Sequence, residues 1–280
     1  MTVLNRRRFV QFCLGGIAVL PWSRMVRALP DGRPACRLSA EQTEGPYYLD
    51  RALFRQDVTE GRSGLPLTLR FEVVDSRTCR PLSGTALEVW HCDAQGEYSG
   101  FTGHGEPGGP GMGAPPGPPP SGRPPGPPPG ADGHMGMGTH PPKSVTTDEL
   151  TFLRGVQVAD ARGAVTFHTI FPGYYMGRCN HIHMKLHVGG ELTDGHYRGG
   201  HVVHTGQLFF EEQASIAAME NAPYQRHGIA RTTLQEDNVY TTQHGEQSIA
   251  ALTPAHAGNA QVARLTLTID PENTSREGWG

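Results

Sequence analysis

The sequence predicts an all-β protein, a β-sandwich of mainly antiparallel strands with long loops and one short helix. Three observations support this fold class. Apolar and polar residues alternate along much of the chain between residues 67 and 269. Turn-forming residues are abundant, with 37 Gly and 24 Pro among 280 residues. Helical periodicity is restricted to a single stretch, and many short strands between frequent turns are typical of a sandwich.

The first strand is the clearest, because Leu67, Leu69 and Phe71 alternate with polar residues before a turn-rich stretch over 75–84. The later segments expected as strands share this alternation and are 87–89, 156–158, 165–169, 181–188, 207–210 and 262–269. A helix is expected only over 211–221, with Ile216 and Met219 on one of its faces.

Residues 1–28 predict an export signal of the twin-arginine type. Three arginines at 6–8 precede an apolar stretch over 12–20, and small and basic residues follow to position 28. We therefore expect an exported protein, periplasmic or extracellular. The apolar stretch is too short to span a bilayer, and no run of 18 or more apolar residues occurs, so we expect no permanent membrane span.

Residues 103–142 predict a disordered insert, because Gly and Pro alternate there and leave few apolar groups to bury. Its Met and His residues could bind copper or nickel weakly, and a solvated insert without a ligand is the alternative. Residues 29–102 and 143–280 then form a single catalytic β-sandwich domain. The 24 basic and 27 acidic residues give a net charge of −3, which argues against a nucleic-acid partner.

Four cysteines remain after the predicted signal: Cys36, Cys79, Cys92 and Cys179. An oxidising compartment favours disulfides, and four cysteines allow three pairings, among which the sequence does not choose. We favour Cys36 with Cys79, a pair that would join the N-terminal segment to the turn after the first strand.

The segment 181–188 carries the strongest chemical pattern. In a strand, its apolar residues face one way, while His181, His183, Lys185 and His187 face the other. Two imidazoles at positions i and i+2 on one face can bind one metal ion. A polar sheet face without a metal is the alternative.

Several short motifs accompany this pattern, in order, over roughly residues 38–210. They are TEGPYY at 43–48, VWH at 89–91, GEYS at 96–99, FLRG at 152–155, PGYY at 172–175, GR at 177–178, HIH at 181–183 and QLFF at 207–210. The combination resembles the intradiol ring-cleavage dioxygenases, the family of the catechol and protocatechuate dioxygenases. This chain departs from the family pattern in its export signal, in its insert, and in a gap of only five residues from Tyr175 to His181.

The resemblance implies one ferric ion, Fe(3+), per chain, held by Tyr98, Tyr175, His181 and His183. It assigns Tyr175 rather than Tyr174 as the ligand, because Tyr175 stands three places after the proline of its motif. The partners implied are a small aromatic diol and O2, and the expected product is a muconate-type diacid. An oligomer is compatible with the sequence.

The resemblance also implies three catalytic residues. Tyr175 leaves the iron and takes up a proton when substrate binds, Arg178 stabilises negative charge on the substrate ring, and Gln207 shapes the pocket. A surface salt bridge for Arg178 and an ordinary strand position for Gln207 are the alternatives.

The donor chemistry supports iron independently of the resemblance. Deprotonating a phenol of pKa near 10 at pH 7 costs about 4 kcal/mol per tyrosine. Two phenolates on one ion therefore require a strong, hard Lewis acid, and trivalent iron suits them better than zinc or ferrous iron. The alternative function is that of a non-enzymatic, secreted β-sandwich that binds a metal.

Overall fold

The computed structural model describes residues 27–28, 34–102, 144–225, 228–255 and 259–275. The predicted signal up to residue 26 and the whole predicted insert 103–142 lie outside the described residues. A two-residue pairing of β1 (Arg27–Ala28) with β2 (Pro34–Ala35) precedes the main body. No helix of the described residues is long and apolar enough to cross a membrane.

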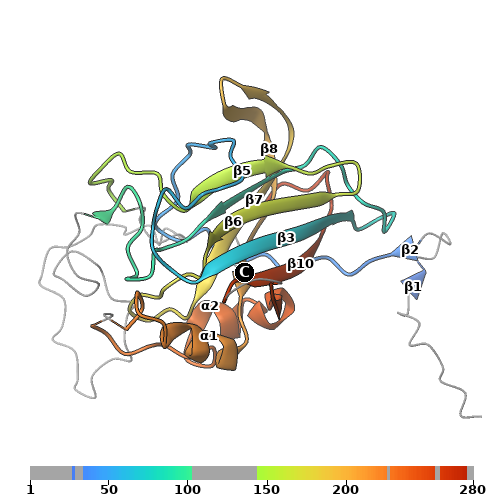
Figure 1. Ribbon diagram of the computed structural model, residues 1–280. Coiled ribbons are helices and arrows are strands. Elements are labelled where there is room, and N and C mark those ends of the chain that lie inside the picture. The colour runs from blue at the N-terminus through green and yellow to red at the C-terminus, as the bar shows by residue number, and fades with distance from the viewer. Residues whose placement is uncertain (1–26, 29–33, 103–143, 226–227, 256–258, 276–280) are drawn as a thin grey trace, which may run out of the picture.

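Two four-stranded sheets form the body of the protein (Figure 1). One sheet has the order β6-β3-β10-β9 and consists of β3 (Pro66–Asp75), β6 (Ala164–Ile170), β9 (Ala251–Pro254) and β10 (Gln261–Ile269). The other has the order β5-β4-β7-β8 and consists of β4 (Ala86–Trp90), β5 (Arg154–Val158), β7 (His181–Thr193) and β8 (His196–Phe209). Only β3 and β10 pair in parallel within these sheets, so the predicted, mainly antiparallel β-sandwich is confirmed.

The core lies between the two sheets. Leu69, Phe71 and Phe167 project from one sheet, and Ile182 and Met184 project from the other. Each of these side chains is at most 3 % exposed. Burial of such side chains is the main favourable contribution to folding, at roughly 1.5–3 kcal/mol each. The alternation predicted for β3 is confirmed by its burial pattern.

The outer face of the second sheet is also buried, because residues 41–54 pass across it. The backbone N–H of Gln42 donates to the carbonyl of Thr205 on β8, and the N–H of Tyr197 donates to the carbonyl of Ala52. Near His181 and His183, this side of β7 is therefore polar in composition but closed to solvent, whereas β7 is exposed from Glu191 to Thr193.

The predicted helix is confirmed as α1 (Glu212–Met219), but its predicted face is only half right. Ser215 and Ala218 form its buried side and Met219 packs against the core, whereas Ile216 is 41 % exposed. The prediction of a single helix missed the five-residue α2 (Asn238–Thr242) and the 3-10 turn η2 (Gly245–Ser248). Both α-helices lie at one end of the sandwich (Figure 1).

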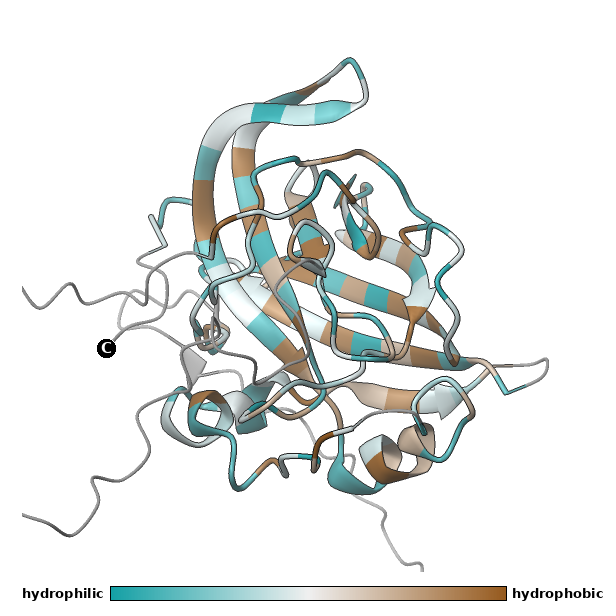
Figure 2. Ribbon diagram, turned by 90° about the vertical axis from the view of Figure 1, so that its left-hand side faces the viewer, coloured by the Kyte–Doolittle hydropathy of each residue, from teal (hydrophilic) through white to brown (hydrophobic). Residues whose placement is uncertain are grey.

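The β7–β8 hairpin extends well beyond the predicted segments 181–188 and 207–210 and bends over at the opposite end (Figure 2). Glycines interrupt the alternation on which the prediction depended. Gly200 has φ +72°, and a Cβ atom there would lie 2.2 Å from the carbonyl oxygen of Val188. Only a glycine fits such a bend.

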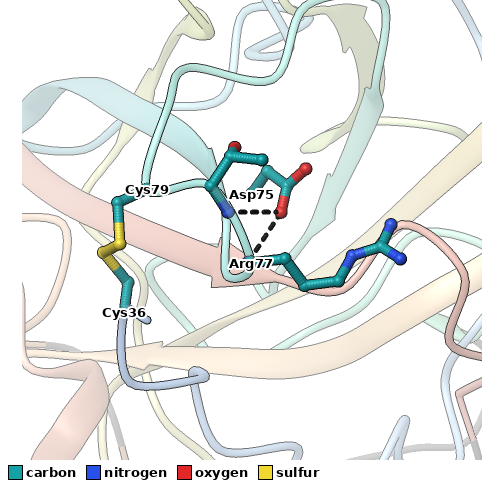
Figure 3. The surroundings of a disulfide bond; sticks show 5 residues. Cys36, Asp75, Arg77 and Cys79 are labelled. Carbon is teal, nitrogen blue, oxygen red and sulfur yellow. Dashed lines mark hydrogen bonds between the residues drawn. A yellow bond between two sulfur atoms is a disulfide. The ribbon is translucent and has the colours of Figure 1, made fainter. Parts of the chain in front are cut away.

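The favoured disulfide is confirmed, because Cys36 and Cys79 are bonded (Figure 3). The turn that presents Cys79 follows β3, where a carboxylate oxygen of Asp75 accepts from the N–H groups of Arg77 and Thr78. Among the described cysteines, Cys92 and Cys179 are free and buried.

The chain leaves and re-enters the sandwich at one place on either side of residues 103–143. The carboxylate of Asp148 accepts hydrogen bonds from the backbone N–H groups of Gly100, at 2.9 Å, and Thr102, at 2.9 Å. The N–H of Thr147 donates to the carbonyl of Gly100. These hydrogen bonds join residues 100–102 to residues 147–148, on the two sides of that segment.

Candidate metal centre

The four residues proposed as ligands lie together at one end of the second sheet. His181 and His183 are the first and third residues of β7, Tyr175 lies in the preceding loop, and Tyr98 follows β4. The Nε2 atoms of His181 and His183 lie 3.1 Å apart, and the Tyr98 hydroxyl lies 3.5 Å from Nε2 of His181. The ring of Tyr175 lies 5.7 Å from that of His181 and 5.8 Å from that of Tyr98.

Aromatic neighbours hold these rings in place. Trp90 stacks on His183, with ring centroids 4.9 Å apart and planes within 6°. Tyr47 stacks on Tyr98 at 4.6 Å. Gly45, which precedes Tyr47, has φ +73°, and a Cβ atom there would lie 3.0 Å from Cε1 of His183. The 43–48 motif therefore needs its glycine to approach the centre.

The hydrogen bonds of His181 fix its tautomer. Its Nδ1 lies 2.7 Å from the carbonyl oxygen of Cys179, so Nδ1 carries the proton and donates, and Nε2 presents its lone pair to the centre. Burial, with a smaller contribution from the Arg178 charge, lowers the pKa of His181 to about 3. Burial also lowers the pKa of His183 well below its ordinary value, so both imidazoles are neutral at pH 7.

The two phenols are neutral as well. Burial raises the pKa of Tyr98 well above 10.0. Burial raises the pKa of Tyr175 to about 12, although the Arg178 cation acts in the opposite direction. Their deprotonation therefore requires a strongly charged ion at the same place.

The donor set fits a single trivalent metal ion. Two donors about 2.1 Å from an ion, at right angles, are about 3 Å apart, close to the Nε2–Nε2 separation of 3.1 Å. In the described parts of the chain, no group of three or more His, Cys, Asp or Glu side chains could hold a metal, so this donor set depends on its two tyrosines. Hard phenolate oxygens with neutral imidazoles suit ferric iron.

Tyr174 and Tyr175 point in different directions. The hydroxyl of Tyr174 donates to the carbonyl of Ile229 at 2.9 Å, whereas the hydroxyl of Tyr175 accepts from Nη1 of Arg178 at 3.4 Å. Tyr175 is therefore the tyrosine that faces the histidines, as the motif position predicts.

Arg178 and Gln207 border this centre. Nη2 of Arg178 donates to Oε1 of Gln207, and Nε2 of Gln207 donates to the carbonyl of Thr43 at 2.8 Å. Nε of Arg178 donates to Oδ2 of Asp237 at 3.0 Å. Burial disfavours the guanidinium cation, but Tyr175 and Asp237 outweigh it and hold the pKa of Arg178 above its ordinary value. The surface salt bridge considered for Arg178 is therefore wrong.

No protein-family model matches the chain, and no curated protein matches its sequence. Solved structures do. An intradiol ring-cleavage dioxygenase from Tetranychus urticae is 30 % identical, with a TM-score of 0.66, and the match covers 88 % of this chain and all 100 % of that one. The chain belongs to the intradiol ring-cleavage dioxygenase family.

Two further solved structures are similar to this chain. A second dioxygenase is 31 % identical, with a TM-score of 0.66 over 88 % of this chain and 100 % of that chain. A 3-chlorocatechol 1,2-dioxygenase from Rhodococcus opacus 1CP is 19 % identical, with a TM-score of 0.47 over 83 % of this chain and 72 % of that chain.

Sequence reasoning missed two supports of this intradiol centre. Arg154, 3 % exposed, donates to both the hydroxyl and the carbonyl of Ser99 and so fixes the turn that carries Tyr98. Asp237, with no exposed surface, pairs with Arg178. The one signal for Asp237 is its place before the short helix α2, where Asp is a favoured N-cap residue.

Proposed function

We propose that the protein is a ferric-iron-dependent intradiol dioxygenase. It opens the ring of a catechol-type substrate between the two hydroxylated carbons, and both atoms of O2 enter a muconate-type diacid. The single observation that carries this proposal is the convergence of two buried phenols and two neutral imidazoles at one end of β7.

Tyr98, Tyr175, His181 and His183 would hold the iron. The ion would supply a Lewis acid that binds the diol and draws electron density from its ring. His181 is suited to be a ligand, because its Nδ1 proton is donated to the Cys179 carbonyl and its Nε2 lone pair is left to bind the ion. Trp90 and Tyr47 pack against the histidine and tyrosine rings and keep bulk water away from the donors.

Tyr175 has a second role, as a proton acceptor. A bound diol would have to lose its phenolic protons, and Tyr175 would hold one of them, because its pKa of about 12 favours the neutral form at pH 7. Nη1 of Arg178 lies 3.4 Å from the Tyr175 hydroxyl, so it would lie beside a substrate ring that takes the place of that phenol. A fixed planar cation there stabilises negative charge on the ring. Gln207, held between Arg178 and Thr43, borders the same space.

The site of action would lie outside the cytoplasm, in the periplasm or the extracellular space. The arginine-containing N-terminal segment supports export. The Cys36–Cys79 disulfide supports it independently, because structural disulfides persist in oxidising compartments.

The test is a visible spectrum and an iron analysis of the purified protein, followed by O2 uptake with catechol, protocatechuate and hydroxyquinol. We expect one iron per chain, a red-brown tyrosinate-to-ferric charge-transfer band, and diol-dependent O2 uptake. A colourless protein that binds iron or copper without O2 uptake would instead favour the non-enzymatic metal-binding function.

Tyr98 and Tyr174 offer a matched pair of variants. Tyr98→Phe removes a proposed ligand and should abolish the colour and the turnover. Tyr174→Phe removes a hydrogen bond to the Ile229 carbonyl and no proposed ligand, so it should keep both. Full activity in Tyr98→Phe would overturn the ligand assignment.

A further inference from the structure

Asp237 is a buried carboxylate far from the family motifs in sequence, and its surroundings give it a role beyond capping a helix. It has no exposed surface. Its Oδ1 accepts from the N–H groups of Val239, at 2.9 Å, and Tyr240, at 3.2 Å, at the start of α2. Its Oδ2 accepts from Nε of Arg178, at 3.0 Å, and from the N–H of Cys179, at 2.9 Å. Four donors therefore surround one carboxylate.

These contacts fix Arg178 on three sides. Asp237 holds Nε, Gln207 accepts from Nη2, and Tyr175 accepts from Nη1 at 3.4 Å. Only 13 % of the arginine side chain is exposed. A guanidinium group is planar and donates in fixed directions, so fixing Nε leaves the Nη atoms with one orientation. A buried cation also requires a counter-charge, and Asp237 is the carboxylate within salt-bridge distance of it.

The same carboxylate also anchors the short loop between Tyr175 and His181. Its hydrogen bond to the Cys179 N–H holds the loop down at the residue whose carbonyl accepts from Nδ1 of His181. One side chain thus orders both the arginine and the loop that leads into β7.

We propose that Asp237 is the positioning residue of Arg178, which it fixes at Nε so that the Nη atoms face Tyr175 and the substrate ring. This inference rests on the proposed function, because it assigns Arg178 a role in ring opening. Among the described residues, Asp237 accepts no hydrogen bond from a proposed ligand; its bond to Nε reaches the arginine, and its bond to the Cys179 N–H orders the loop.

Two substitutions separate positioning from capping. Each carboxylate oxygen of Asp237 accepts from two N–H groups. In Asp237→Asn, an NH2 group replaces one of these oxygens, so the two N–H groups that faced it lose their acceptor. Asp237→Ser keeps an N-cap oxygen for α2 and removes the counter-charge, so it tests the proposal even if the first variant folds poorly. Asp160→Asn is the control, because Asp160 also accepts from two backbone N–H groups, in an exposed turn.

The decisive experiment is a double-mutant cycle on the iron-loaded protein. We expect Asp237→Asn and Asp237→Ser to lower kcat by about 100-fold, the loss that a misplaced catalytic group can cause. Iron content and the charge-transfer band should be retained, and Asp160→Asn should match wild type. In an Arg178→Ala background, the Asp237 substitutions should change kcat by less than about twofold. An equal loss in both backgrounds, or no loss in either, would overturn the proposal.

A second measurement needs neither iron nor activity. Phenylglyoxal modifies accessible arginines, and peptide mass spectrometry reports which ones react. In iron-free protein, Arg178 should be protected in wild type and lose that protection in Asp237→Ser. Arg231, paired with Glu212 and 15 % exposed, is the matched internal control and should react at the same rate in both proteins. Continued protection of Arg178 would contradict the inference, whereas a wild type without O2 uptake would refute only the proposed function.

Discussion

Iron loading should release protons in a number set by the two tyrosines. With a pKa of about 12, Tyr175 is ionised to only about 1 part in 100,000 at pH 7, and burial raises the pKa of Tyr98 so that it is neutral too. With a pKa of about 3, His181 is protonated to only about 1 part in 10,000. Each phenol must therefore lose a whole proton to become a ligand, and the imidazoles lose none. Ionising Tyr175 alone costs about 7 kcal/mol at pH 7, which the metal has to offset.

The assay is a titration of iron-free protein with ferric nitrilotriacetate, with proton release followed by a pH-stat. Protons exchanged by the chelator or by water cancel in the difference between two variants. Wild type should release one proton per bound iron more than Tyr98→Phe does, and Tyr174→Phe should release as many as wild type. Between pH 6 and 8, the apparent iron affinity of wild type should rise about tenfold more per pH unit than that of Tyr98→Phe. Equal proton counts at equal iron content would refute the assignment of Tyr98 as a phenolate ligand.

Three further outcomes concern groups other than the four proposed ligands. Burial lowers the pKa of His204 to about 4, so its contribution to stability is present above pH 6.5 and is lost as the pH falls to 4. His204→Gln should therefore reduce the loss of unfolding free energy between pH 6.5 and pH 4, followed by urea unfolding, by about 3 kcal/mol. The Cys36–Cys79 disulfide spans 43 residues, so replacing both cysteines by serine should lower the free energy of unfolding by about 4 kcal/mol on the chain-entropy estimate. Lys185→Met should cost about 3–5 kcal/mol in the same assay because it leaves the Glu44 carboxylate buried without its ammonium partner, and adding Glu44→Gln should restore most of the loss.

The strands that could be predicted are those whose two faces differ. Leu67, Leu69 and Phe71 alternate with polar residues because one face of β3 packs on the core and the other faces outwards. The outer half of the β7–β8 hairpin could not be predicted, because Gly200 and its neighbouring glycines have no side chains to carry a pattern. Helix α2 could not be predicted either, because five residues are too few to show helical periodicity.

The candidate site divides in the same way. Tyr98, Tyr175, His181 and His183 lie in short local motifs, so a resemblance can identify them from sequence. Asp237 lies in no such motif, and its pairing with Arg178 spans 59 positions and arises only when the segment after α1 folds back. Long-range hydrogen bonds of this kind leave no periodic signal in a single sequence.

The strand β7 links the stability of the protein to the geometry of the candidate metal centre. Ile182, Met184 and Leu186 pack in the core between the sheets, while His181 and His183 point from the same strand towards the two tyrosines. In a strand, successive side chains point to opposite faces, so a one-residue shift of register would exchange the two sets. One register of β7 therefore both packs the aliphatic residues in the core and stacks His183 on Trp90. The core fixes the register, and the register brings the two Nε2 atoms close together. The burial that keeps the two tyrosines and two histidines uncharged is thus compatible with a site that is assembled before any metal binds.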